Sequence, residues 1–410
     1  MSSNKKTFGQ RLKSMGPAAI ITSAFIGPGT ITTCTKAGVS FGYSLLWTVV
    51  LSGIALIVLM EMSARTTLAT GKNLIDSSAE IAPNSKAWRG FTLAVFVIGV
   101  LSVCFAFQAG NEIGAANGLK DILGMQNIMI PAIVVGLLAL ATTWLGSYKT
   151  LEMIMQFFVS AMGILFLVTA IAIKPDFGAI AKGLIPSLPD GSTVTALGLI
   201  GTTLVAINLI VHSISCEERY HSKDDLGDAR FDIGINISVG VIITLAILIA
   251  AAAGMSGMEV KSPLDYTHAL EPLLGSWARI IGDLALFCAG LSSAIAVSYS
   301  IRSIFSRIFK WEGGSMSMPA KIVGTIVILF GTAFAMFGKT PADIIVIAQA
   351  VSGFSLPFIA VILLAVANNK RIMGDLRNKA TSNIIGVIMA ALTLFLGGRT
   401  FINIIIGLFK

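Results

Sequence analysis

The sequence predicts an all-α integral membrane protein with eleven transmembrane helices, and three observations support this fold class. Of the 410 residues, 55% are hydrophobic and only 12% are charged, whereas soluble domains carry roughly 25% charged residues. The mean hydropathy is +0.85. The apolar residues fall into runs near the length of about 20 residues that a helix needs to cross a bilayer. These runs are too long for barrel strands and do not alternate, so we expect neither strands nor a soluble enzyme.

The expected spans begin after a short basic segment, residues 1–16. No cleavage site of small residues follows this segment, so we interpret it as a cytosolic tail and not as a signal peptide. The polar loops between the spans are too short to form a soluble domain. By length and hydropathy, the expected spans are 17–43, 44–68, 91–119, 129–147, 151–173, 193–217, 231–254, 276–306, 319–337, 343–368 and 382–408.

The lysines and arginines predict the orientation of the chain. With the N-terminus in the cytosol, most of the 29 basic residues fall in cytosolic segments, as the positive-inside rule requires. We therefore expect a multi-pass protein of the cell membrane with its N-terminus inside and its C-terminus outside. The net charge of +8 is then explained by loops that face an anionic leaflet, and a nucleic-acid partner is not expected. Glu61 and Arg65, four residues apart, should form an ion pair on one helix face.

The cysteines suggest neither a metal site nor a disulfide framework, because they lie far apart and form no CxxC pair. We expect no cofactor, and the sequence does not predict an oligomeric state. The four are Cys34, Cys104, Cys216 and Cys288.

The first span is interrupted in mid-membrane by the segment Ile26-Gly27-Pro28-Gly29-Thr30. A proline between two glycines removes a helix hydrogen bond and frees backbone groups that must find other partners. Backbone of this kind persists at membrane depth only where it is buried in protein or lines a cavity. The alternatives are a kinked packing helix and a binding site, and we favour the binding site.

The sixth span carries a weaker sign of interruption, since it holds Gly198, Gly201, Thr202 and Thr203 but no proline. Spans one and six would each head a five-helix unit, over residues 17–173 and 193–368, with the span 382–408 added at the end. Units with an odd number of helices have inverted topology, and interrupted helices in corresponding positions are typical of a transporter binding site.

At these residues the sequence resembles the NRAMP family of proton-coupled divalent metal transporters, over essentially the whole chain. The family's Asp-Pro-Gly-Asn in the first helix corresponds to Gly27-Pro28-Gly29-Thr30. The resemblance implies the leucine-transporter architecture, a 5+5 inverted repeat with substrate bound between helices one and six. Further matching segments are Ala37-Gly38, Phe41-Gly42-Tyr43, Leu45-Leu46-Trp47, Ala69 to Leu74, Asn208, His212-Ser213, Ala289 to Ser293, Gln349 and Leu356-Pro357-Phe358.

The departures from the family pattern fall on its chemical groups. Gly27 stands at the metal-binding aspartate, Thr30 at the asparagine, Val205 at the methionine and Ile207 at a helix-six histidine. The acidic pair of the family's proton pathway aligns with Gln108 and Asn111, with Glu112 beside them. His212 matches the second helix-six histidine, and Arg219 matches an arginine of the exit path.

The remaining donors at the predicted site are hydroxyls, amides and free carbonyls. Transition metals prefer carboxylate, imidazole or sulfur ligands, and neutral oxygens alone compensate poorly for removing water from a divalent ion. Helix N-termini at the two interruptions, with Lys36 two turns past the first, favour an anion. We therefore hypothesise that the substrate is a small anion, such as bicarbonate or a short carboxylate, and that no metal site is present.

Two alternatives remain open. The first is a divalent cation, Mg²⁺ or Mn²⁺, carried partly hydrated with or without protons, for which Glu112 could supply charge. The second is a sensor that uses the transporter fold without transport. In each case the partners are a small solute and the lipid bilayer. The candidate substrate-binding residues are Gly27, Pro28, Gly29, Thr30, Lys36, Thr202, Thr203, Val205, Asn208 and Gln349, and the candidate coupling or pathway residues are Gln108, Asn111, Glu112, His212 and Arg219.

Overall fold

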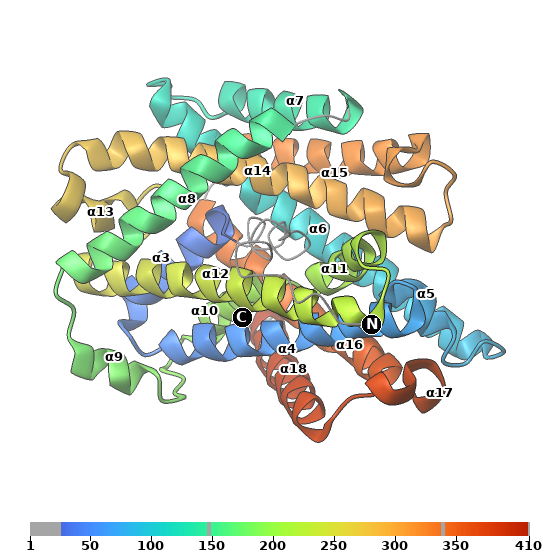
Figure 1. Ribbon diagram of the computed structural model, residues 1–410. Helices are drawn as coiled ribbons and strands as arrows, with labels where there is room; N and C mark the ends of the chain where they lie inside the picture. The colour runs from blue at the N-terminus through green and yellow to red at the C-terminus, as the bar shows by residue number, and fades with distance from the viewer. Residues whose placement is uncertain (1–25, 146–148, 338–340, 409–410) are drawn as a thin grey trace.

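The computed structural model describes residues 26–145, 149–337 and 341–408, and within these ranges the secondary structure is entirely helical (Figure 1). The predicted fold class is therefore confirmed. Labels follow Figure 1 and begin at α3. The helices are α3 (Pro28–Phe41), α4 (Leu46–Thr70), α5 (Leu74–Ala79), α6 (Lys86–Ile122), α7 (Met129–Leu145), α8 (Lys149–Ala172), α9 (Phe177–Gly183), α10 (Thr193–Thr203), α11 (Ala206–Arg219), α12 (Leu226–Gly254), α13 (Thr267–Leu274), α14 (Trp277–Ile308), α15 (Met318–Phe337), α16 (Pro341–Asn368), α17 (Lys370–Met373) and α18 (Ala380–Leu408), with 3₁₀ turns η1 (Lys223–Asp225), η2 (Gly314–Met316) and η3 (Gly374–Leu376).

The structure shows fewer clear membrane spans among its described residues than the eleven that the sequence predicts. Among the described residues, eight helices are long and apolar enough to cross a membrane, or nine if the bent pair formed by α8 and α9 is one span. Of the other expected spans, α7 has 17 residues and α3 has 14. Residues 17–25 of the first expected span, and the tail 1–16, lie outside the described ranges. The count of eleven spans therefore stays a prediction.

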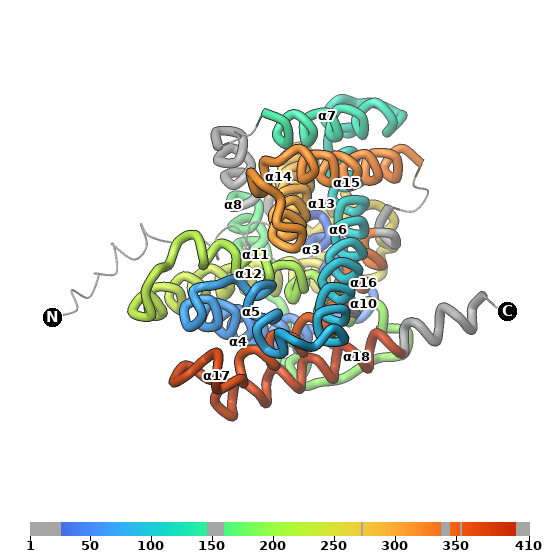
Figure 2. The backbone as a smooth tube through the Cα atoms, turned by 90° about the vertical axis from the view of Figure 1, so that its right-hand side faces the viewer, coloured from blue at the N-terminus to red at the C-terminus, as the bar shows by residue number. Residues whose placement is uncertain are grey.

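The helices pack in layers, with α7 along one edge and α18 along the opposite edge (Figures 1 and 2). Helices α14 and α15 lie under α7, and α6 contacts both of them as well as α16. The outer helices expose large apolar side chains, as a surface in contact with lipid does. Examples are Leu137 and Leu138 on α7, Leu329 on α15, and Val387 and Ile388 on α18.

Among the candidate membrane spans, the one formed by α10 and α11 is the most deeply enclosed. In its most apolar stretch of 18 residues, 94% are buried. Helix α10 packs on α16 and α3, and α11 packs on α4, α6, α14 and α16. A span enclosed on all sides by protein is where irregular backbone can persist at membrane depth.

The second predicted interruption is present, and at the first the described residues begin with Ile26 and show where the helix starts. The first break is the segment Ile26–Gly27, after which α3 begins at Pro28, and the backbone of Gly27 is extended with no side-chain cap. The second break is the pair Leu204–Val205 between α10 and α11, which leaves helical geometry without a proline. The division into two inverted five-helix units is consistent with these positions and stays a prediction.

Close packing of α6 on α14 is made possible by glycine. A Cβ atom at Gly290 of α14 would lie 2.6 Å from the main-chain atoms Asn111 O and Ala115 N of α6. Likewise, a Cβ atom at Gly118 of α6 would lie 2.5 Å from Asp283 O of α14. Small residues let membrane helices approach closely, and this contact fixes the positions of Asn111 and Ser293.

Replacing Gly290 with alanine is expected to lower the thermal stability of the detergent-solubilised protein. The added Cβ meets backbone that cannot rotate away, and overpacking of this kind costs about 1–3 kcal/mol. The measurement is the midpoint of thermal unfolding, monitored by size-exclusion chromatography of heated samples. Gly234→Ala on α12 is the control, because a Cβ there meets nothing within 4 Å. Equal midpoints for the two variants would contradict the close contact between α6 and α14.

Candidate functional site

The two breaks share neighbours. Helix α3, which starts at the first break, packs against α6, α10 and α16, and α11, which starts at the second, packs against α6 and α16. Contact between α3 and α10 is close, since a Cβ at Gly198 would lie 3.3 Å from Thr33 Cγ2. Helices α6 and α16 therefore form common walls for both breaks.

Gly27 at the first break lies against α14 and α6. A Cβ at this position would be 2.6 Å from Ser293 Oγ and 3.6 Å from Asn111 Oδ1. The ring of Pro28 packs directly on Gly114 of α6, where a Cβ would overlap it. The first break thus presents backbone, a serine hydroxyl and an amide oxygen to one another in a buried setting.

Gln349 of α16 lies on the first turn of α3. Gly29 leaves room for its amide group, because a Cβ there would collide with Gln349 Nε2. The side chain of Gln349 is only 1% exposed, yet its Oε1 has no hydrogen-bond partner among the described residues. A carbonyl oxygen in this state is available to a ligand.

Unpartnered polar atoms gather on the helices that enclose the breaks. Buried side-chain polar groups in proteins are nearly always hydrogen-bonded. Here, within the described ranges, Asn111 Nδ2 on α6, Asn208 Nδ2 on α11 and Gln349 Oε1 on α16 are buried without a partner, as is Gln108 Oε1. The hydroxyls of Thr32, Thr33 and Thr35 on α3 are in the same state. This concentration indicates a region built to hold a polar ligand or water.

Other predicted binding residues take more structural roles. The hydroxyls of Thr202 and Thr203 lie 2.9 and 3.4 Å from Leu199 O in their own helix. Val205 is buried at the N-terminus of α11, and Thr30 is buried in the first turn of α3. Lys36 follows Pro28 by eight residues, which places it about 12 Å along the helix axis.

Glu112 does not supply charge at the first break. Its carboxylate accepts hydrogen bonds from Thr332 Oγ1 at 2.6 Å and Gln108 Nε2 at 2.8 Å. A Cβ at Gly331 of α15 would lie 2.8 Å from Glu112 Oε1. Successive helical residues point about 100° apart, so Asn111 faces the break while Glu112 faces α15. The idea that Glu112 turns toward the break is therefore wrong for this conformation.

The second half of the sixth span leads away from the break through His212 to Arg219. His212 is buried one turn after Asn208, with its ring nitrogens 3.7 and 3.8 Å from Cys216 Sγ. Near the end of α11, the carboxylate of Glu217 accepts a hydrogen bond from Asn73 Nδ2 at 3.1 Å. Arg307 of α14 forms ion pairs at 3.3 Å with Glu217 and Glu218. These contacts fasten the end of α11 to its neighbours.

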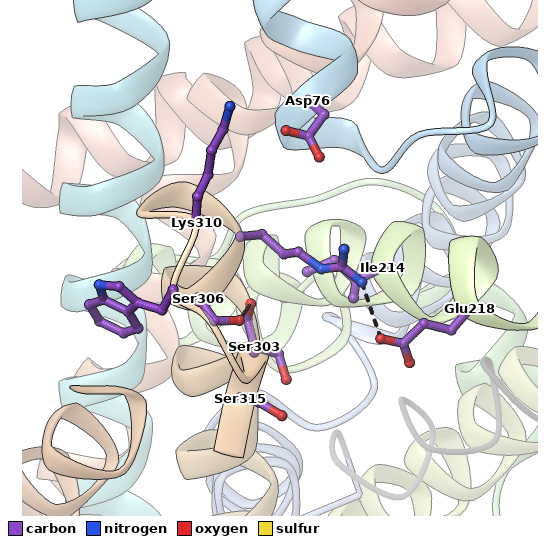
Figure 3. Close-up of a pocket in the computed structure, with 10 residues that line it drawn as sticks. Asp76, Ile214, Glu218, Ser303, Ser306, Lys310 and Ser315 are labelled. Atoms are coloured by element: carbon purple, nitrogen blue, oxygen red, sulfur yellow. Dashed lines mark hydrogen bonds and ion pairs between the residues drawn. The ribbon is translucent and has the colours of Figure 1, made fainter. Parts of the chain in front are cut away.

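A cavity of about 580 Å³ opens beside this end of α11 (Figure 3). Its wall combines Ile214 and Glu218 of α11 with Ser303, Ser306 and Arg307 of α14. Ile214 follows Asn208 by six residues, so the cavity begins about 9 Å along α11 from the unpartnered amide. It lies on the side that the basic residues predict to be cytosolic. The geometry suits a polar vestibule between the breaks and that face.

The sequence pointed to most of these residues but did not single out Ser293, Asn73, Glu217 or Arg307. Ser293 belongs to a matching family motif, which was the available signal. The other three come together only through the packing of α5, α11 and α14. Among the described residues, no group of three or more His, Cys, Asp and Glu side chains could hold a metal ion.

The broken helices, the buried polar region between shared walls and the one-sided vestibule define a membrane transporter of the leucine-transporter architecture. The family model for natural resistance-associated macrophage protein-like proteins matches residues 18–403. The chain therefore belongs to the NRAMP family, and the resemblance seen in its motifs is confirmed. Members of this family are transporters and not enzymes. The orientation of the termini stays a prediction.

Relatives cover almost the whole chain. It is 28% identical over 410 residues to the divalent metal cation transporter MntH of Yersinia pestis (strain Pestoides F), covering 96% of each protein. It is also 28% identical to the MntH of Klebsiella pneumoniae (strain 342), covering 99% of this chain and 98% of the relative.

Solved structures share the fold. A mutant of the Eremococcus coleocola manganese transporter superposes with a TM-score of 0.79 at 19% identity, covering 100% of this chain and 90% of that chain. Mhp1, a nucleobase-cation-symport-1 family transporter, gives a TM-score of 0.61 at 16% identity, covering 93% of this chain and 90% of that chain.

Replacing Asn208 with leucine is expected to impair transport while maintaining or raising thermal stability. The leucine removes an unpartnered buried amide, whose burial costs about 1–3 kcal/mol. A lost hydrogen bond to a charged ligand is worth about 1.5–3 kcal/mol, or roughly tenfold to hundredfold in affinity. Uptake into proteoliposomes and thermal unfolding measure the two effects.

The matched control for this variant is Asn117→Leu, since Asn117 Nδ2 already donates to Ile113 O at 2.8 Å. Transport by this control should match the wild type. If Asn208→Leu transports normally, the second break is not a ligand site.

Proposed function

We propose that this protein carries a divalent metal cation by alternating access, bound at the two breaks with part of its hydration shell. The observation that carries the proposal is the buried Gln349 Oε1, which has no partner among the described residues, together with Asn111 Oδ1, which lies 3.6 Å from the Cβ position of Gly27 at the first break. The names of the relatives support a cation, because the MntH proteins are divalent metal cation transporters. This differs from the anion hypothesis that the sequence favoured, which the names of these relatives do not support.

The ends of the broken helices also support a cation. Helix α10 stops at Thr203, so its last carbonyl groups lack helical partners and lie at the second break. The C-terminal end of a helix carries partial negative charge, which attracts cations. The oxygens of Asn208, Gln349 and Ser293 are further neutral donors. Together they can replace some of the waters of a divalent ion.

We propose magnesium in preference to manganese. Mg²⁺ binds oxygen, gives up water reluctantly and keeps several water ligands, so it needs few direct contacts. Manganese and iron gain more from carboxylate, imidazole or sulfur groups. Gly27 and Val205 provide none of these at the positions where the family resemblance implies them. A hydrated ion fits the donors that are present.

We also propose that transport is passive. Gln108 and Asn111 stand where the resemblance implies an acidic proton pathway, and the carboxylate of Glu112 is bonded to Gln108 and Thr332. His212 and Arg219 remain candidates for the path between the breaks and the cytosolic face. The vestibule and the ion pairs of Arg307 are suited to opening and closing this path.

A small anion remains a second candidate, favoured by one specific observation. Helices α3 and α11 both begin at the breaks without a side-chain cap and without an acidic residue in the first turn. Free N–H groups at a helix N-terminus bind anions well. Bicarbonate or a short carboxylate is the anion class that the space between the breaks would accept.

Uptake by proteoliposomes tests these proposals directly. Mg²⁺ entry at millimolar concentration is expected, with weaker Mn²⁺ entry and no accompanying acidification of the interior. Empty liposomes and the Asn208→Leu variant serve as controls. Saturable Mn²⁺ uptake at micromolar concentration would contradict the preference for magnesium. Uptake of bicarbonate alone would support the anion candidate, and no uptake of any of these ions would support a sensor.

A carboxylate at position 27 should change the selectivity. Ser293→Ala makes room for the new side chain, since a Cβ at Gly27 lies 2.6 Å from Ser293 Oγ. In this background, Gly27→Asp is expected to increase Mn²⁺ affinity by at least about tenfold, because a charged ligand adds about 1.5–3 kcal/mol. Ser293→Ala alone is the control in the same uptake assay. Abolition of bicarbonate uptake with no gain for Mn²⁺ would instead identify an anion site.

A further inference from the structure

A second cavity, of about 480 Å³, lies between α4, the start of α12 and the start of α18. One end of its wall is charged and the other is apolar. The charged part includes Glu61, Arg230, Arg377 and Lys379, and the apolar part is formed by Ile57 and Val58. This cavity is separate from the breaks and from the vestibule beside α11.

The charged end carries an excess of positive charge. The carboxylate of Glu61 accepts hydrogen bonds from Arg65 Nε at 3.1 Å and from Arg230 Nη2 at 2.7 Å. The predicted ion pair between Glu61 and Arg65 is thus confirmed. One carboxylate therefore offsets the charge of only one of the two guanidinium groups, and the three side chains together keep a net positive charge.

Arg65 also holds the wall of the cavity in place. It donates to Leu376 O and, at 2.6 Å, to Asn378 Oδ1 in the segment before α18. Asn378 in turn donates to Asn383 Oδ1 at 2.6 Å, and its main-chain N–H donates to Ala367 O at 2.9 Å. The segment that carries Arg377 and Lys379 is therefore fixed to α4, α16 and α18.

Arg377 and Lys379 are exposed and make no ion pair or side-chain hydrogen bond with the described part of the chain. With Arg65 and Arg230 they give the cavity four cations against the carboxylates of Glu61 and Asp375. Guanidinium and ammonium groups in such a cluster are well suited to a phosphate oxygen.

In the predicted orientation, the apolar end of the cavity lies deeper in the membrane than the charged end. Ile57 and Val58 precede Glu61 by four and three residues, which places them about 5–6 Å farther along α4. Beyond the charged end, α18 exposes Ile384, Val387 and Ile388. An occupant of this cavity would meet cations at one end and hydrocarbon at the other.

We propose that this cavity binds an anionic phospholipid, with its phosphate at Arg230, Arg377 and Lys379 and an acyl chain along Ile57 and Val58. Basic pockets between transmembrane helices on the cytoplasmic side are suited to anionic headgroups. General attraction between basic loops and the leaflet requires neither an enclosed cavity nor an apolar extension. The site gives the last helix, α18, a role that is independent of the proposed substrate.

Native mass spectrometry of the full-length protein tests the site, with equal amounts of phosphatidylglycerol and phosphatidylcholine in detergent. The wild type should retain phosphatidylglycerol preferentially. In the double variant Arg377→Gln/Lys379→Gln, the ratio of retained phosphatidylglycerol to phosphatidylcholine should fall about thirtyfold, since each basic residue near an anionic lipid contributes about 1 kcal/mol. Each single variant should lose about fivefold by the same reasoning.

The control is Lys86→Gln/Arg89→Gln, which removes the same charge from exposed positions at the start of α6. This control should retain the wild-type ratio. An equal loss in both double variants would show attraction to surface charge in general and would overturn the proposal. Displacement of the lipid by millimolar glycerol phosphate would also overturn it, because the site would then recognise a soluble phosphate.

Discussion

The structure depends on the need to satisfy backbone polar groups where a helix stops inside the membrane. Lipid offers no hydrogen bonds, so groups freed at Gly27 and at Leu204–Val205 must be enclosed by protein or by a polar ligand. Helices α6, α14 and α16 provide that enclosure. Their close approach through Gly290 and Gly118 places Asn111 and Ser293 beside the first break, and Gly29 admits Gln349. The same enclosure leaves several polar atoms without partners, which makes the region fit to bind an ion.

The sequence predicted the fold class and the first break well, because both depend on local signals. Hydropathy and run length define helices in a bilayer, and Pro28 between two glycines marks the place where a helix begins. The second break has no such signal. Leu204 and Val205 are ordinary residues in a helix, and only the resemblance to the NRAMP family indicated that the span is interrupted there. The bend after α8 does have a local signal, because Pro175 and the N-cap residue Asp176 stand between α8 and α9.

The composition of the site was harder to predict than its location. Ser293 reaches Gly27 only because α14 packs on α6, which is a long-range contact. Asn111 and Glu112 are neighbours in sequence but point to different helices, so the carboxylate of Glu112 lies between α6 and α15. Lys36 is close to the first break in sequence but lies about 12 Å along α3 from Pro28. The charge of the substrate is hard to predict for the same reason, since it depends on which groups converge and not on which are present.

Anomalous diffraction from crystals soaked in millimolar Mn²⁺ tests most directly whether the breaks form the ion site. Manganese serves here as a detectable substitute for magnesium, which it resembles in binding oxygen ligands. The account predicts an anomalous peak between α3 and α11, beside Gln349 and Asn208, that disappears when magnesium is added in excess. A peak at Glu112 and Thr332 instead, or no peak between the broken helices, would contradict it.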